Sequence, residues 1–174
     1  AVLGIKIEDI EKILIDNKKN FNAQIANDNS DGQIVLSGKN EDLDSASNFL
    51  RDNKIKNIKL PVSAPFHCEL MTKATEIMRK ELENVDFKKS NNTLISNVTA
   101  DEILDVKDLK NLLISQIEKK VRWRESIINM VNYGVSQFIE IGPGKVLSGL
   151  IKRINKNVKI TSINNQSDIE SLRI

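Results

Sequence analysis

The first sixty residues alternate between the hydrophobic periodicities of strands and helices, and this alternation limits the folds that the chain can adopt. Short apolar runs typical of strands lie at 1–5, 22–28, 33–38 and 55–61. Apolar residues at helical spacing occupy 7–16 and 40–52, and Asn40 is the expected cap of the second helix. The predicted order is β-α-β-β-α-β, the split unit of a small ferredoxin-like subdomain.

After Pro61 the pattern changes to strands separated by longer helices. We predict helices over 66–84, 106–117, 123–134 and 145–156. Strands are predicted over 92–98, 137–141 and 158–163. The fold class is therefore α/β, with a predicted domain boundary between a small subdomain, residues 1–60, and an α/β body, residues 61–174.

Composition excludes several classes of protein. The net charge of +2 gives no broad basic face for nucleic acid. A single Cys excludes an internal disulfide and a Cys-rich zinc site, and no run reaches the length of a membrane-spanning helix. The chain starts at Ala1 within a strand-like run, which we interpret as a piece of a longer polypeptide.

The stretch "LPVSAPFHCELM", residues 60–71, contains the only His, His67, and the only Cys, Cys68. A His at a helix start most often has a structural role, and a metal site is unfavourable without a second His. Adjacent helical side chains diverge by about 100°, so Cys68 is a poor partner for His67. The remaining functional role is a general base. No G-x-S-x-G elbow is present, so the nucleophile of such a base lies outside this chain.

The same stretch resembles the catalytic-histidine segment of malonyl-CoA:acyl carrier protein transacylases, Leu-Pro-Val-Ser-x-Pro-x-His-Cys-x-Leu-Met. Three further segments are similar to that family and occur in its order: "NDNSDGQIVLSG" at 27–38, "ISQIEKKVRW" at 114–123 and "FIEIGPGKVLSGLIKRI" at 138–154. The resemblance implies a ferredoxin-like subdomain and the C-terminal part of an α/β-hydrolase-like acyltransferase body. The nucleophilic Ser and the carboxylate-binding Arg of the family fall outside this chain.

The resemblance also implies an activity and its residues. Malonyl passes from malonyl-CoA to a serine and then to the phosphopantetheine thiol of acyl carrier protein, in type II fatty acid synthesis. His67 is the implied base, and the main-chain carbonyl of Gln116 orients its ring. The positions that match the substrate pocket are Asn27, Asn29, Gln33 and Phe66. Many bacterial relatives have Ser in place of Phe66, and the bulky ring implies a preference for malonyl over methylmalonyl.

Basic residues form one side of the last long helix, and they are Lys145, Lys152, Arg153 and Lys156. The simplest interpretation is a solvated helix face. The resemblance instead implies that they bind acyl carrier protein, with Lys152 and Arg153 at the family's docking positions.

The resemblance further implies a monomer with a CoA thioester substrate and no bound cofactor, metal, nucleic acid or membrane. The expected compartment is the cytoplasm of a bacterium or a plastid-type organelle of a eukaryote. Two alternatives stay open: a catalytically incomplete relative that only binds acyl carrier protein, and a hydrolase with the same body.

Overall fold

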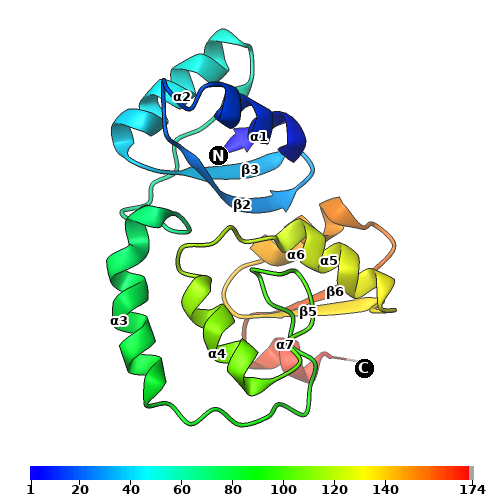
Figure 1. Ribbon diagram of the computed structural model, residues 1–174. Coiled ribbons are helices and arrows are strands. Elements are labelled where there is room, and N and C mark those ends of the chain that lie inside the picture. The colour runs from blue at the N-terminus through cyan, green and yellow to red at the C-terminus, as the bar shows by residue number, and fades with distance from the viewer. Residues whose placement is uncertain (173–174) are drawn as a thin grey trace. The chain divides into compact units, whose positions relative to one another are not determined.

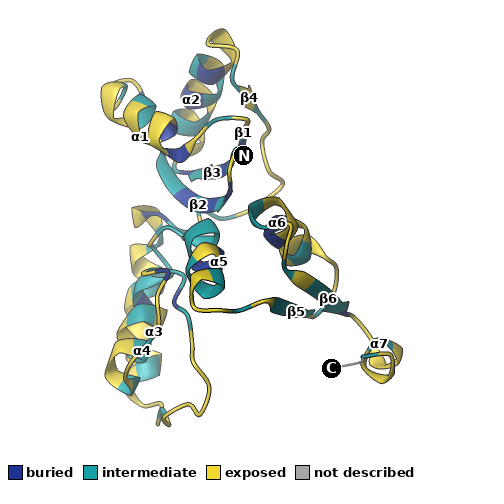
Figure 2. Cartoon of the chain, turned by 90° about the vertical axis from the view of Figure 1, so that its right-hand side faces the viewer, coloured by how far each residue is buried: buried dark blue, intermediate teal, exposed yellow. Residues whose placement is uncertain are grey.

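A computed structural model describes residues 1–172, which divide into two compact units, the first Ala1–Ser126 and the second from Ile127 onward. The first begins with six short elements (Figures 1 and 2), which are β1 (Val2–Leu3), α1 (Ile7–Asp16), β2 (Gln24–Ser30), β3 (Gln33–Ser37), α2 (Asn40–Asp52) and β4 (Lys56–Asn57). The predicted β-α-β-β-α-β order of this part is confirmed. The division into domains at residue 60 stays a prediction.

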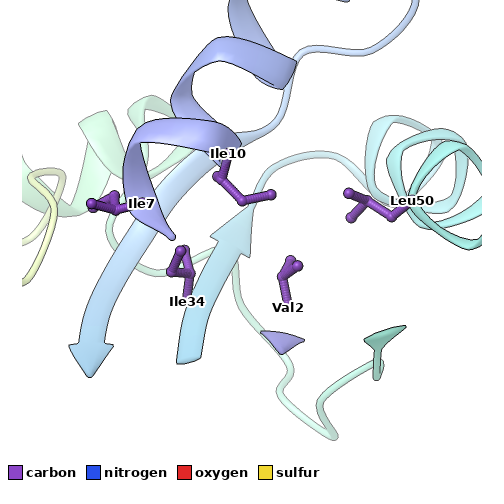
Figure 3. Packing of buried hydrophobic residues seen from close by; sticks show 5 residues of the cluster. All are labelled: Val2, Ile7, Ile10, Ile34 and Leu50. Atoms are coloured by element: carbon purple, nitrogen blue, oxygen red, sulfur yellow. The ribbon is translucent and has the colours of Figure 1, made fainter. Parts of the chain in front are cut away.

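The four strands form one antiparallel sheet in the order β2-β3-β1-β4. The core of this part lies between the sheet and the helices α1 and α2. Figure 3 shows the buried side chains that meet there, Val2, Ile7, Ile10, Ile34 and Leu50. A second cluster consists of Phe21, Ala23 and Ala46. The apolar stripes read from the sequence are therefore the faces that these helices bury.

A tight turn connects β2 to β3 where the sequence contains Gly. The β2–β3 hairpin turns at Asp31-Gly32, and Gly32 has a positive φ of 73°, a conformation that glycine adopts without strain. The carbonyl of Gly32 accepts a hydrogen bond from the N–H of Gly4 at 2.9 Å. A Cβ at Gly32 would meet the backbone of Gly4 at 3.3 Å, so a side chain there is crowded as well as strained.

The structure differs from the sequence prediction in several details. The predicted strand 92–98 is wrong, because this stretch makes only an isolated bridge between Ile95 and Glu102. Ser96 accepts hydrogen bonds from the N–H groups of Val98 and Ala100, and this local turn replaces a strand ladder. The N-cap of α2 is Lys39 instead of Asn40, which is the first helical residue.

The remaining elements of the first unit are helical. They are a 3₁₀ turn (Glu69–Met71), α3 (Thr72–Glu83), α4 (Val106–Ser115) and α5 (Trp123–Asn132), which continues into the second unit. No residue of α3 is buried, and the helix is largely exposed in Figure 2. Its apolar side chains, such as Ile77, therefore lie at the surface.

The second unit contains a β-α-β unit, as predicted. It consists of β5 (Gln137–Ile141), α6 (Val146–Ile154) and β6 (Lys159–Ile163), and the two strands pair in parallel. Leu150 and Ile151 are the buried residues of α6. A short helix that the sequence analysis missed, α7 (Gln166–Glu170), begins with a capping box of Asn165 and Asp168. Among the described residues no helix is long and apolar enough to cross a membrane.

Candidate active site

His67 lies in a turn before the helical region and not in a helix. The predicted helix over 66–84 is therefore too long at its N-terminus, since the 3₁₀ turn begins at Glu69 and α3 at Thr72. His67 has a positive φ of 60°, a backbone conformation that residues other than glycine rarely adopt. Such backbone strain is concentrated at functional sites, where surrounding contacts hold it in place.

Two hydrogen bonds hold His67 against the end of α4. Its backbone N–H donates to the carbonyl of Ile117 at 3.1 Å, and Nδ1 lies 2.8 Å from the carbonyl oxygen of Gln116. Because a carbonyl oxygen can only accept, Nδ1 carries the proton of this bond. A neutral imidazole then has its lone pair on Nε2, the arrangement that a general base needs. The structure gives Nε2 no hydrogen-bond partner within residues 1–172.

The thiol of Cys68 has hydrogen-bond partners other than the imidazole. The thiol is buried, with a residue exposure of 1%, and donates to the carbonyl of Pro65 at 3.2 Å. The hydroxyl of Ser37 in β3 donates to the same sulfur at 3.6 Å. Cys68 therefore anchors the turn to the sheet, and its thiol is not placed to act as the nucleophile of His67.

The side of the turn that carries Phe66 and His67 borders a pocket of about 580 Å³ within the first unit. Asn27 of β2 also lines this pocket. Phe66 is half exposed, at 51%. Asn29 and Gln33, the other predicted pocket residues, are not among the residues that line it. The structure thus brings three of the predicted residues together and leaves two outside.

An ion pair that sequence reasoning missed lies beside these residues. Asp28, between Asn27 and Asn29, is 1% exposed, and both of its oxygens accept from Nε of Arg124, at 3.1 and 3.0 Å. Nη2 of Arg124 lies 2.9 Å from Oδ2 of Asp28. Burial raises the pKa of Asp28, and Arg124 opposes that shift, while the bond to Asp28 raises the pKa of Arg124. The two residues are 96 positions apart, so no local pattern could have paired them.

In the second unit the four predicted basic residues, Lys145, Lys152, Arg153 and Lys156, are exposed. Lys152 and Arg153 lie in the last turn of α6, where positive charge is favourable to the helix dipole. At the other end of α6, Glu140 of β5 accepts hydrogen bonds from the N–H groups of Leu147 and Ser148, at 3.1 and 2.8 Å. Bonds from Ser148 and Leu147 lower the pKa of Glu140. The motif "EIGPG" therefore ties the strand to the helix start.

Within the described part of the chain, no group of three His, Cys, Asp or Glu side chains could hold a metal ion. The candidate active site holds an imidazole whose Nδ1 proton is fixed by the carbonyl of Gln116. Such a group can take a proton from a hydroxyl or thiol placed at Nε2 and return it later.

Comparison with known proteins identifies relatives by sequence. No family model matches the chain. The chain is 41% identical over 172 residues to the malonyl CoA-acyl carrier protein transacylase of Bacillus subtilis strain 168, covering 98% of this chain and 54% of that protein. It is 36% identical over 174 residues to the corresponding transacylase of Staphylococcus aureus strain COL, covering 98% of this chain and 56% of that one.

Solved structures agree with the sequence relatives. The malonyl CoA-acyl carrier protein transacylase of Clostridium perfringens superposes with a TM-score of 0.93 at 39% identity, covering 98% of this chain and 54% of that one. A malonyl-transacylase solved in complex with a type II polyketide acyl carrier protein gives 0.91 at 29% identity, covering 98% and 55%. The chain spans about half the length of the relatives it matches. With its four motifs in the family's order, it corresponds to the C-terminal portion of malonyl-CoA:acyl carrier protein transacylases.

Proposed function

We propose that this chain provides the base and part of the substrate pocket for malonyl transfer from malonyl-CoA to the phosphopantetheine thiol of acyl carrier protein. The contact between Nδ1 of His67 and the carbonyl of Gln116 at 2.8 Å carries the proposal, because it leaves Nε2 as the proton acceptor. The nucleophilic serine belongs to the part of the family fold that this chain does not match.

In the first step Nε2 of His67 takes the serine proton while the serine oxygen attacks the thioester carbonyl. The carbon–sulfur bond breaks, and the imidazolium gives its proton to the sulfur of the leaving CoA thiolate. In the second step His67 deprotonates the carrier thiol, whose sulfur attacks the malonyl ester, and the serine recovers its proton. A carbonyl at Nδ1 fixes the ring tautomer without the negative charge that an Asp would supply.

A chimera tests this proposal directly. The matching portion of the Bacillus subtilis transacylase is replaced by this chain, to which it is 41% identical. We expect the chimera to gain one malonyl group from malonyl-CoA and to pass it to acyl carrier protein, both measured by intact-mass spectrometry. A folded chimera that releases malonate to water would favour the hydrolase alternative. One that binds acyl carrier protein without acylation would favour the binding-only alternative.

Phe66 is proposed to select the acyl group. It lines the pocket next to His67 and is half exposed there, so its ring can crowd an α-methyl branch. In the chimera we expect malonyl-CoA to be preferred over methylmalonyl-CoA, and Phe66→Ser to reduce that preference. One methyl group changes selectivity by about 1–3 kcal/mol, or roughly 10–200-fold. Competition between the two thioesters measures the ratio, and an unchanged ratio in Phe66→Ser would contradict this role.

The exposed basic residues of α6 are proposed to bind acyl carrier protein, as a relative of this chain is solved in complex with such a protein. Acyl carrier proteins are acidic, so we expect Lys152→Glu with Arg153→Glu to weaken binding to the carrier and to reduce its salt dependence. Lys18→Glu with Lys19→Glu is the matched control, since it changes the same charge at two adjacent exposed residues of the first unit. Equal binding by both double variants, measured by calorimetry, would exclude the docking role.

The relatives also support the remaining features of the proposal. Malonyl-CoA is the substrate, and the reaction needs no bound cofactor. The relatives named above are bacterial proteins, so we propose the bacterial cytoplasm as the compartment and treat a plastid-type organelle as the less supported alternative.

A further inference from the structure

The segment 116–124 connects the carbonyls that hold His67 to an ion pair on the neighbouring sheet. It starts at Gln116 and Ile117, whose carbonyls accept from the ring and the backbone of His67. It ends at Arg124, in the first turn of α5. Whatever fixes this segment therefore also fixes the position of the acceptor that orients the imidazole.

The segment is attached to β2 by a short parallel bridge. The N–H of Val121 donates to the carbonyl of Ala26 at 2.8 Å, and the N–H of Asp28 donates to the carbonyl of Val121 at 2.9 Å. The pairing of β2 with β3 shifts register on either side of these residues, between Ile25 and Asn27 and between Asp28 and Ser30. Such irregularities free strand groups for other partners. Two hydrogen bonds, however, make a weak attachment.

The Asp28–Arg124 pair is the buried element of this attachment. Nε and Nη2 of Arg124 contact the Asp28 carboxylate at 2.9 to 3.1 Å, with side-chain exposures of 18% and 1%. A buried charge that loses its partner is strongly unfavourable, so the pair tolerates little displacement of the segment along β2. Two further side-chain links to this subdomain, Lys120 to Glu11 at 3.2 Å and Arg124 to Asp31 at 3.8 Å, involve more exposed carboxylates and contribute little.

A second set of hydrogen bonds attaches segment 116–124 to the loop at residues 97–99 and not to β2. Arg122 donates from its backbone to the carbonyl of Asn97 and from Nη1 to that of Thr99, each at 2.9 Å. These bonds hold the segment to the 97–99 loop, and the Asp28–Arg124 pair sets its register on the sheet that also contributes Asn27 to the pocket.

We propose that Asp28 and Arg124 are positioning residues, whose ion pair fixes segment 116–124 on β2 and thereby keeps the Gln116 carbonyl in place to hold the Nδ1-protonated tautomer of His67. The catalytic meaning of this arrangement rests on the proposed function, in which His67 is the base. The geometric part concerns the 174-residue chain alone and can be measured without activity.

The experiment uses the fact that His67 is the only histidine of the chain. Long-range ¹H–¹⁵N correlation spectra therefore show one imidazole, and its two nitrogen shifts report the tautomer at a pH where the ring is neutral. In the unaltered chain we expect the Nδ1-protonated form. In Arg124→Met and in Asp28→Asn we expect loss of that preference and growth of the Nε2-protonated form, which free imidazole side chains favour. Lys120→Met, which breaks a more exposed ion pair of the same segment, should leave the tautomer unchanged.

The outcomes separate clearly. Unchanged Nδ1 protonation in variants whose amide spectra show a folded chain would overturn the proposal and leave the pair with a purely stabilising role. If Arg124→Met does not fold, Asp28→Asn decides the question, because it keeps the shape of the side chain and removes only its charge. A different result would contradict the proposed function alone. In that case the chimera transfers no malonyl, although Arg124→Met changes the tautomer of His67 in the chain.

Discussion

Replacement of His67 by alanine is expected to lower the kcat/KM of malonyl transfer by the chimera about 10²–10⁴-fold, the usual contribution of a general base. The imidazole is the group whose proton position is fixed at this site, by the 2.8 Å contact from Nδ1 to Gln116. Without it, the serine and the carrier thiol must lose their protons to water. Stopped assays of carrier malonylation measure the effect.

The matched control is Lys73→Ala, an exposed side chain at the start of α3, which should leave kcat/KM unchanged. Circular dichroism establishes that both variants are folded. His67→Ala activity within a few-fold of the parent would show that another group acts as the base. A slower acylation by malonyl-CoA together with an equally slowed transfer to the carrier is the expected pattern, since His67 serves both half-reactions.

Arg124→Met is expected to destabilise the chain by about 3–5 kcal/mol, because it leaves the Asp28 carboxylate buried without a partner. Urea denaturation followed by circular dichroism measures the change in the free energy of unfolding. Asp28→Asn with Arg124→Met should recover much of the loss, since no buried charge remains. The exposed pair of Lys59 and Asp44 provides the comparison, and Lys59→Met should have an effect of about 0–1 kcal/mol.

The destabilisation by Arg124→Met should depend on pH. Burial raises the pKa of Asp28 in the folded chain above its value in the unfolded chain, so folding favours the protonated carboxyl. The resulting contribution to the stability of the folded chain is fully present below the pKa that Asp28 has in the unfolded chain. It is lost as the pH rises through the pKa that Asp28 has in the folded chain. Removal of Arg124 raises the folded pKa further. The stability difference between variant and parent should therefore be large at neutral pH and shrink in acid, and a difference independent of pH would contradict this origin.

Much of the fold could be predicted because its elements depend on local patterns. The β-α-β-β-α-β order follows from apolar periodicity, as in α1, where Ile7 and Ile10 are buried. The parallel pairing of β5 and β6 follows from the helix between them. The same reasoning failed at 92–98, because hydrogen bonds from nearby backbone N–H groups to Ser96 form there in place of a strand ladder.

The sequence was sufficient to predict which residues belong to the candidate site, but not how they are arranged in space. The motif around His67 indicated the base, and the resemblance indicated the Gln116 carbonyl. Neither showed that the chain leaves the helical conformation at His67, since a positive φ there depends on contacts with Ile117 and Gln116, 50 and 49 positions away. No sequence pattern indicated the Asp28–Arg124 pair. Asp28 lies in a stretch of Asn and Ser typical of turns, and Arg124 lies in an amphipathic helix.

The burial of Asp28 against Arg124 also constrains how this sequence can change over generations. Loss of either partner alone leaves a chain that carries an uncompensated charge, whereas loss of both restores a neutral interior. The fitness effect of a mutation at one position therefore depends on the residue at the other, a case of epistasis between sites 96 positions apart. Descendants of this chain should keep the pair intact or lose it as a unit, and lineages with only one member should be short-lived.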